Sequence, residues 1–112
     1  MEAAVAPAAV AVTDLGSGQI QVRGALTFAT ARAARIAGAK LLQKGAGPVL
    51  VVDCGGVSVS DSAGLAVLVD WLAVAKLHGR GIRFKELPPA LHAVAQISDV
   101  ESILIQGITA HA

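Results

Sequence analysis

Cysteine is almost absent from this chain of 112 residues, which contains only Cys54. A single cysteine excludes an internal disulfide and any metal site assembled from several cysteines, and it fits a reducing compartment. Because Cys54 directly follows an apolar run, we expect it to be a small core residue without redox function.

Aromatic side chains are also scarce, at 3% of the residues, although hydrophobic residues as a whole reach 54%. The three large rings are Phe28, Trp71 and Phe84. The core must therefore be built from Val, Leu, Ile and Ala. The length allows one domain with a two-layer core and is too short for two.

Neither sign of charge predominates. Nine Lys and Arg residues stand against eight Asp and Glu residues, which gives a formal net charge of +1. This balance offers no electrostatic case for binding nucleic acid or an anionic membrane. We therefore expect a protein partner, recognised through apolar surface and specific motifs.

Long hydrophobic runs and targeting signals are missing as well. The most apolar stretch, Ala63 to Ala75, is interrupted by Asp70 and is shorter than the ~20 residues of a membrane span. No Lys or Arg precedes Arg23, so the N-terminus lacks the charged region of a signal peptide. We expect a cytoplasmic protein without direct membrane insertion.

Apolar periodicity and turn residues predict an alternation of strands and helices. After a flexible lead-in over residues 1–9, the expected elements are a hairpin with Val10, Val12, Ile20 and Val22, a helix from Thr27 or Thr30 to about Lys44, and a buried strand Val49 to Val52 ended by Asp53 to Gly56. The second half of the chain should contain a helix to about His78, a strand with Ile82 and Phe84, and a helix from Pro88 to Ile97. A strand Ile103 to Ile105 and a tail over 107–112 should follow.

This order indicates the α/β class. Alternation of helix and strand after the hairpin favours parallel strands joined by right-handed crossovers. We expect a mixed, mostly parallel β-sheet with an N-terminal antiparallel hairpin and with its α-helices mainly on one face.

The stretch from Ser60 to Leu65 joins a strand pattern to a helical one. Ser60 or Asp61 can cap the helix by accepting hydrogen bonds from its free backbone N–H groups, which places Ser62 on the first turn. A phosphate on Ser62 would add roughly −1.5 to −2 charges at the positive end of the helix dipole and beside the carboxylate of Asp61. These two effects oppose each other, so the modification would change what the surface offers a partner and need not unfold it.

The same stretch resembles a known signature. Asp61-Ser62-Ala63-Gly64-Leu65 is similar to the D-[ST]-[SAG]-G-L motif of STAS domains, regulatory modules named after sulfate transporters and anti-sigma factor antagonists. The resemblance implies a STAS domain over residues 10–106. In the antagonists the serine at the place of Ser62 is phosphorylated by a partner kinase, so Ser62 is the candidate phospho-acceptor. The opening Val22-Arg23-Gly24-Ala25-Leu26-Thr27-Phe28 resembles the V-x-G-x-L-T-F of STAS subunits in bacterial phospholipid-transport systems.

The helix after the motif carries two apolar stripes. One contains Leu65, Leu68 and Leu72, and the other contains Val67 and Trp71 at the same helical spacing. Two interpretations are open for the second stripe: flanking helices cover it, or it extends a docking face that begins at Ser62. We adopt the second as a hypothesis, because exposed Trp is typical of interaction hot spots.

The sequence gives less support to an enzymatic function than to a role in protein interaction. Ser60 to Gly64 is a near miss for the G-x-S-x-G nucleophile elbow, with only His78 and His92 as interior candidates for a base. The chain has no P-loop, and Asp53 with Asp61 lacks the further ligand spacing of a cation site. We expect no enzyme activity, no cofactor and no metal.

The resemblance implies a protein-interaction module whose partner-binding residues are Ser60, Asp61, Ser62, Ala63, Gly64, Val67 and Trp71. Its first candidate partner is the cytoplasmic ATPase of an Mla-type ABC transporter that moves phospholipid, which would place the chain at the inner face of the membrane. The alternative is an anti-sigma factor antagonist, for which the partner is an anti-sigma factor with serine kinase activity and phosphorylation of Ser62 is the switch.

Overall fold

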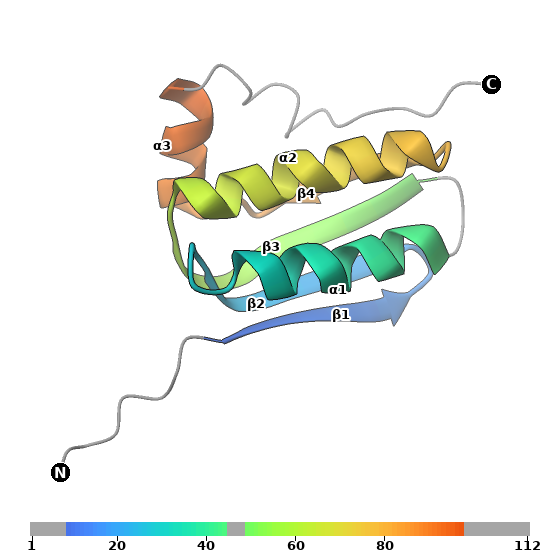
Figure 1. Ribbon diagram of the computed structural model, residues 1–112, viewed down its shortest axis with the longest axis horizontal. Helices are drawn as coiled ribbons and strands as arrows, with labels where there is room; N and C mark the ends of the chain where they lie inside the picture. The colour runs from blue at the N-terminus through green and yellow to red at the C-terminus, as the bar shows by residue number, and fades with distance from the viewer. Residues whose placement is uncertain (1–8, 45–48, 98–112) are drawn as a thin grey trace, which may run out of the picture.

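Strands and helices alternate along the chain, and the strands lie in the sheet in chain order. The computed structural model describes residues 9–44 and 49–97. Its elements are β1 (Val10–Gly16), β2 (Gln19–Leu26), α1 (Ala31–Lys44), β3 (Val49–Ser60), α2 (Ser62–Leu77), β4 (Gly81–Lys85) and α3 (Pro89–Ile97). The described strands form one sheet of order β1-β2-β3-β4, with α1 and α2 side by side on one face (Figure 1).

The N-terminal hairpin is present as predicted. β1 and β2 pair antiparallel, with Val12 opposite Val22. Their turn needs backbone of positive φ, which Gly16 (86°) and Gly18 (78°) adopt without steric cost and Ser17 (53°) also adopts. β2 then pairs in parallel with β3, and β3 with β4, so the predicted mixed, mostly parallel sheet is confirmed.

The third strand is longer than predicted. We expected it to end at Asp53, but β3 continues through Gly55 and Gly56 to Ser60. Its second half keeps its partner, since Gly56 pairs with Arg23 and Ser60 with Leu26, across two register shifts in the β2–β3 ladder. Bulges of this kind let a strand pass irregular residues without losing its neighbour. The glycines therefore bend the strand rather than end it.

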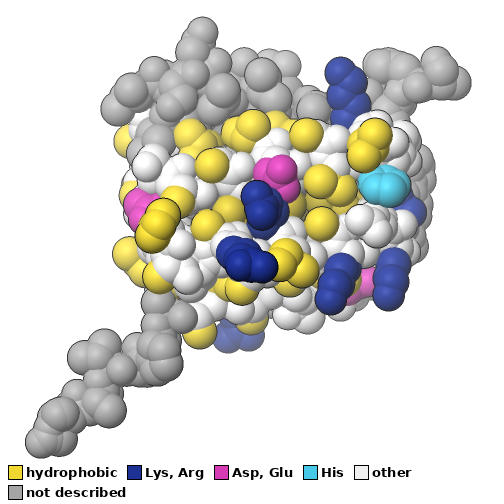
Figure 2. Space-filling model, viewed as in Figure 1, with side chains coloured by type: hydrophobic (Ala, Val, Ile, Leu, Met, Phe, Trp, Pro, Cys, Tyr) yellow, Lys and Arg dark blue, Asp and Glu magenta, His cyan; other side chains and the backbone are white. Residues whose placement is uncertain are grey.

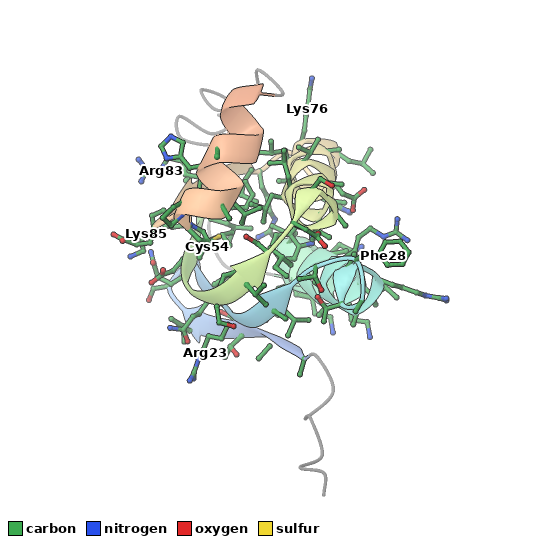
Figure 3. The ribbon with its side chains drawn as sticks, turned by 90° about the vertical axis from the view of Figure 1, so that its left-hand side faces the viewer. Arg23, Phe28, Cys54, Lys76, Arg83 and Lys85 are labelled. Carbon is green, nitrogen blue, oxygen red and sulfur yellow. The ribbon has the colours of Figure 1, made fainter. Side chains whose placement is uncertain are left out.

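The core lies between the sheet and the helices. Alternate residues of the strands point into it, including Ile20, Val22, Leu50, Val52 and Phe84. Arg23, Arg83 and Lys85 alternate with them and are exposed on the opposite face of the sheet (Figure 3). Alternation of this kind is expected where one face of a sheet is packed and the other is not.

Both apolar stripes of α2 are buried, which contradicts the hypothesis that the second is a docking face. Trp71 is 1% exposed and Val67 is 3% exposed. The first stripe packs on the sheet, and α1 covers the second. The indole lies against Gly38 of α1, and its Nε1 donates a hydrogen bond of 3.4 Å to the carbonyl oxygen of Arg35. The interpretation that a flanking helix covers this stripe is the correct one.

The ends of the predicted domain are only partly described. The carbonyl oxygen of Ala9 accepts a hydrogen bond of 2.8 Å from the backbone N–H of Ala25, which joins the last residue of the predicted lead-in to the sheet. At the other end, Leu91 of α3 is buried in the core. The rest of the lead-in, the predicted strand Ile103 to Ile105 and the tail 107–112 lie outside the described residues.

The contact between Gly38 and Trp71 yields a stability prediction. Gly to Ala within a helix normally stabilises by about 1 kcal/mol through helix propensity. At residue 38, however, a Cβ would overlap the buried indole ring, and overpacking of this kind costs about 1–3 kcal/mol. Because the overlap is with several ring atoms, we expect the overpacking to outweigh the gain in propensity, so that Gly38→Ala lowers the free energy of unfolding by up to about 2 kcal/mol. Denaturant titration of wild type and Gly38→Ala measures this change in the free energy of unfolding.

Fluorescence reports on the same contact, because Trp71 is the only tryptophan in the chain. Its emission should change in Gly38→Ala. Ala33→Gly, on the exposed side of the same helix, is the matched control: it should cost about 1 kcal/mol through propensity alone and leave the emission unchanged. A more stable Gly38→Ala protein would contradict this packing.

Candidate functional site

Asp61 begins α2 as its N-cap. Its backbone is extended (φ −144°, ψ −170°), and its Oδ1 accepts hydrogen bonds from the backbone N–H groups of Ala63 (2.9 Å) and Gly64 (3.2 Å). The first N–H groups of a helix have no partner within the helix, so this carboxylate satisfies two of them. Of the two predicted caps, Asp61 is the correct one.

The other oxygen of the same carboxylate reaches a different loop. Oδ2 of Asp61 accepts a hydrogen bond of 3.1 Å from the backbone N–H of Phe28, 33 residues away in the chain. This bond, with smaller contributions from those of Gly64 and Ala63, lowers the pKa of the Asp61 carboxyl, although partial removal from water opposes the shift. Asp61 is therefore an anion at neutral pH that links the β2–α1 loop to the start of α2.

The β2–α1 loop is itself held by the buried Thr30. Its hydroxyl donates to the carbonyl oxygen of Ala25 (2.8 Å) and accepts from the backbone N–H of Thr27 (3.0 Å). With Asp61 bound from the other side, the loop presents Phe28 with 84% of its surface exposed. Figure 3 shows this ring on the helix side of the molecule, away from the sheet. The helix was expected to begin at Thr27 or Thr30, but α1 begins at Ala31, so Phe28 lies in the loop before it.

Ser62 lies on the one stripe of α2 that faces water. The exposed positions in its first four turns recur at spacings of four and three residues: Ser62, Ala66, Val69, Ala73 and Lys76. Spacings of four and three residues place these positions on a single helix face. The other positions between Ser62 and Lys76 are buried or half-buried. Ser62 is thus an exposed hydroxyl on the first turn, where the dipole of α2 favours negative charge.

Gly64 is buried and plays a packing role. A Cβ at this position would overlap the carbonyl oxygen of Leu26, at the end of β2. Glycine therefore lets the start of α2 approach the sheet closely. This explains why the motif carries Gly here, and it means that Gly64 is not part of the exposed surface.

Five of the seven predicted partner-binding residues, Ser60 to Gly64, lie together at the start of α2, but they differ in solvent exposure. Ser62 is exposed, Ser60, Asp61 and Ala63 are half-buried, and Gly64 is buried. We call the surface formed by Phe28, Ser60, Asp61, Ser62 and Ala63 the docking tip. Phe28 joins it through the Asp61 hydrogen bond, which no short-range sequence pattern indicates; the only signal was its place in the V-x-G-x-L-T-F opening.

Cys54, the acidic side chains and His78 are the other candidate groups for reactivity or metal binding. Burial, with the nearby charge of Asp53, raises the pKa of the Cys54 thiol to about 12, so the thiolate is disfavoured. No group of three or more His, Cys, Asp or Glu side chains gathers within residues 9–44 and 49–97. His78 follows the last turn of α2, a full helix away from Ser62. Over the same residues, no helix is long and apolar enough to span a membrane.

Comparison with known proteins agrees with this geometry. The family model described as "Mlab, STAS domain" matches residues 10–106. Among solved structures, the chain is similar to the anti-sigma factor antagonist SpoIIAA in its unphosphorylated form, with a TM-score of 0.60 and 14% identity over 80% of this chain and 83% of that one. It is also similar to an anti-sigma factor antagonist from Mycobacterium paratuberculosis, with a TM-score of 0.59 and 22% identity over 86% of this chain and 81% of that one. No curated protein matches it.

The Asp61 carboxylate predicts a specific acid dependence. Because its folded pKa lies below the unfolded value of about 3.9, it adds stability that is complete above that value and is lost as the pH falls through the folded pKa. Asp61→Asn can still cap α2, but its amide nitrogen cannot accept from Phe28. We expect wild type to unfold several degrees above this variant at neutral pH. The gap should close on acidification, and a constant gap would contradict the prediction.

Gly64 yields a second prediction. In Gly64→Ala the added methyl group meets a backbone oxygen of β2, which cannot swing aside as a side chain can. We expect a loss of about 1–3 kcal/mol in the free energy of unfolding, despite the better helix propensity of Ala. Ala66→Gly on the exposed stripe is the control and should cost about 1 kcal/mol from propensity alone. An unchanged or more stable Gly64→Ala protein would show that α2 does not need this close approach.

Proposed function

The chain belongs to the STAS domain family, and from that membership we propose that it is a non-enzymatic module that binds another protein through the docking tip. One observation carries the proposal: a single carboxylate, that of Asp61, holds the exposed Ser62 turn and the exposed Phe28 loop together. A preorganised surface loses little conformational entropy on binding, and an exposed aromatic ring suits an interaction hot spot.

The position of His78 supports the non-enzymatic part of the proposal. A serine nucleophile needs a base within hydrogen-bond reach. His78 lies beyond the far end of α2, and that helix of 16 residues is about 24 Å long at 1.5 Å per residue. The near miss to a nucleophile elbow at Ser60 to Gly64 is better explained by the Asp61 cap and the close approach of Gly64.

We propose the ATPase of an Mla-type phospholipid-transport ABC system as the partner. The V-x-G-x-L-T-F opening supports this assignment, since its last residue, Phe28, lies in the docking tip. The description of the matching family as Mlab points in the same direction. In this role the chain would stabilise or regulate the ATPase at the inner face of the membrane.

An anti-sigma factor antagonist is the second candidate. Its support is the exposure of Ser62 on the first turn of α2, where a phosphate would be accessible to a kinase. The added charge of about −1.5 to −2 would be favoured by the helix dipole and opposed by the anionic Asp61 close by. Phosphorylation would then alter the docking tip and release an anti-sigma kinase without unfolding α2.

Affinity capture of the tagged protein from its own cells tests both candidates. We expect wild type and Ser62→Ala to retain the partner and Ser62→Glu to lose most of it, because a charge enters the contact. Ser17→Glu, in the exposed β1–β2 turn at the opposite end of the sheet, is the control for added charge and should retain it (Figure 1).

The identity of the retained protein separates the candidates. An ABC ATPase supports the transport role, and a serine kinase without an ATPase supports the sigma-switch role. Full retention by Ser62→Glu would contradict the docking tip as the contact. Capture of neither class by wild type would contradict both roles.

A further inference from the structure

An open groove runs between α1 and α2, starting at the docking tip. Its volume is about 640 Å³, Phe28 and Ile36 provide its larger exposed apolar groups, and the buried Val67 lies at its floor. Phe28 is 84% exposed and Ile36 is 45% exposed, which is unusual for large apolar side chains that share one groove. Arg32, Arg35 and Asp70 also line it. Figure 2 shows basic and acidic side chains beside each other among hydrophobic ones on the face that these helices form.

The two walls of the groove carry matched residues. Each lining residue on the α1 side, Ile36 apart, has a counterpart on the α2 side 35 positions later in the chain: Phe28 with Ala63, Ala31 with Ala66, Arg32 with Val67, and Arg35 with Asp70. At one end of the groove Phe28 is large and its counterpart Ala63 is small, and further along Arg35 is cationic and its counterpart Asp70 is anionic. The walls are therefore complementary in size at the first pair and in charge at the last.

These counterparts also lie at the same height along the helices. The hydrogen bond from Nε1 of Trp71 to the carbonyl oxygen of Arg35 places residue 35 of α1 beside the turn of α2 that carries residues 70 and 71. α1 and α2 run in the same direction, as parallel crossovers require (Figure 1). Equal heights on two parallel helices are the condition for a two-fold axis to exchange one helix for the other.

We propose that this groove is the contact surface of a symmetric homodimer in which Arg35 of each copy pairs with Asp70 of the other. A two-fold axis that runs along the groove, parallel to both helices, places α1 of one copy over α2 of the second. In such an isologous contact every pair occurs twice. Phe28 then packs on Ala63 of the other copy, and two Arg35–Asp70 pairs form between the copies.

The dimer would cover the docking tip. Phe28 and Ala63 belong both to the tip and to the groove, so a second copy and a protein partner cannot occupy them together. Self-association would hold the module in an unavailable state until a partner competes with it. This regulatory consequence rests on the proposed function, whereas the dimer itself does not.

Sedimentation of the purified full chain over a wide concentration range tests the proposal. We expect wild type to shift from monomer to dimer as concentration rises. Arg35→Asp and Asp70→Arg should each raise the dimer dissociation constant by about tenfold or more, because two like-charged pairs are brought together. An equal mixture of the two variants should recover the dimer, since each reversed side chain then meets an opposite charge in the other copy.

Two further variants complete the experiment. Lys85→Asp reverses a charge on the outer face of the sheet and should leave the dimer intact. Ile36→Ser changes an exposed apolar residue without changing charge, should weaken the dimer, and serves if half-buried Asp70 does not tolerate reversal. A wild type that stays monomeric would overturn the proposal. So would a mixture of folded charge variants that stays monomeric, or an Ile36→Ser protein that dimerises like wild type. Partner capture through Ser62 is measured separately, so either proposal can fail alone.

Discussion

The burial of α2 on two sides is the constraint on which the rest of the molecule depends. A helix with two apolar stripes is stable in water only if both are covered, because each exposed Leu, Val or Trp forgoes roughly 1.5–3 kcal/mol of burial. Here the sheet covers one stripe and α1 covers the other. Both neighbours must come close, and a glycine stands at each closest point: Gly64 against the end of β2, and Gly38 of α1 against Trp71.

The surface of the site follows from this packing. With two faces of α2 buried, one stripe remains for solvent, and Ser62 is its first member. The position of α2 also sets the position of Asp61, whose second oxygen holds Phe28. The exposed serine and the exposed ring are therefore placed by backbone hydrogen bonds and core packing rather than by contacts of their own. Changes to the two side chains should therefore leave the scaffold unchanged.

Sequence patterns predicted the parts of the structure that depend on local chemistry. The hairpin, the helix and strand order and an N-cap before Ser62 all follow from turn residues, capping residues and apolar spacing. The patterns failed where distant segments decide. Nothing near Gly55 and Gly56 indicates that β2 continues to pair beyond them, so β3 was predicted too short.

The same limit explains the error at Trp71 and the omission of Phe28. Whether an apolar helix face is a core face or a surface depends on which element lies over it. For Trp71 that element is α1, and the residue in contact with the indole is Gly38. Because glycine has no side chain, the apolar pattern of the sequence does not indicate this contact. For Phe28 the deciding group is a carboxylate 33 residues away, which bonds to backbone rather than to a recognisable side-chain pair.

The order of the described sheet has a consequence for how the chain assembles. Each strand pairs only with the strand before it and the strand after it, so the sheet can grow in the direction of synthesis, with the local β1–β2 hairpin first. A nascent chain that has released α1 but not yet α2 still lacks the cover over Gly38 and the carboxylate that holds the Phe28 loop. The proposed docking tip is thus completed late in synthesis, and a partially synthesised chain does not yet present it.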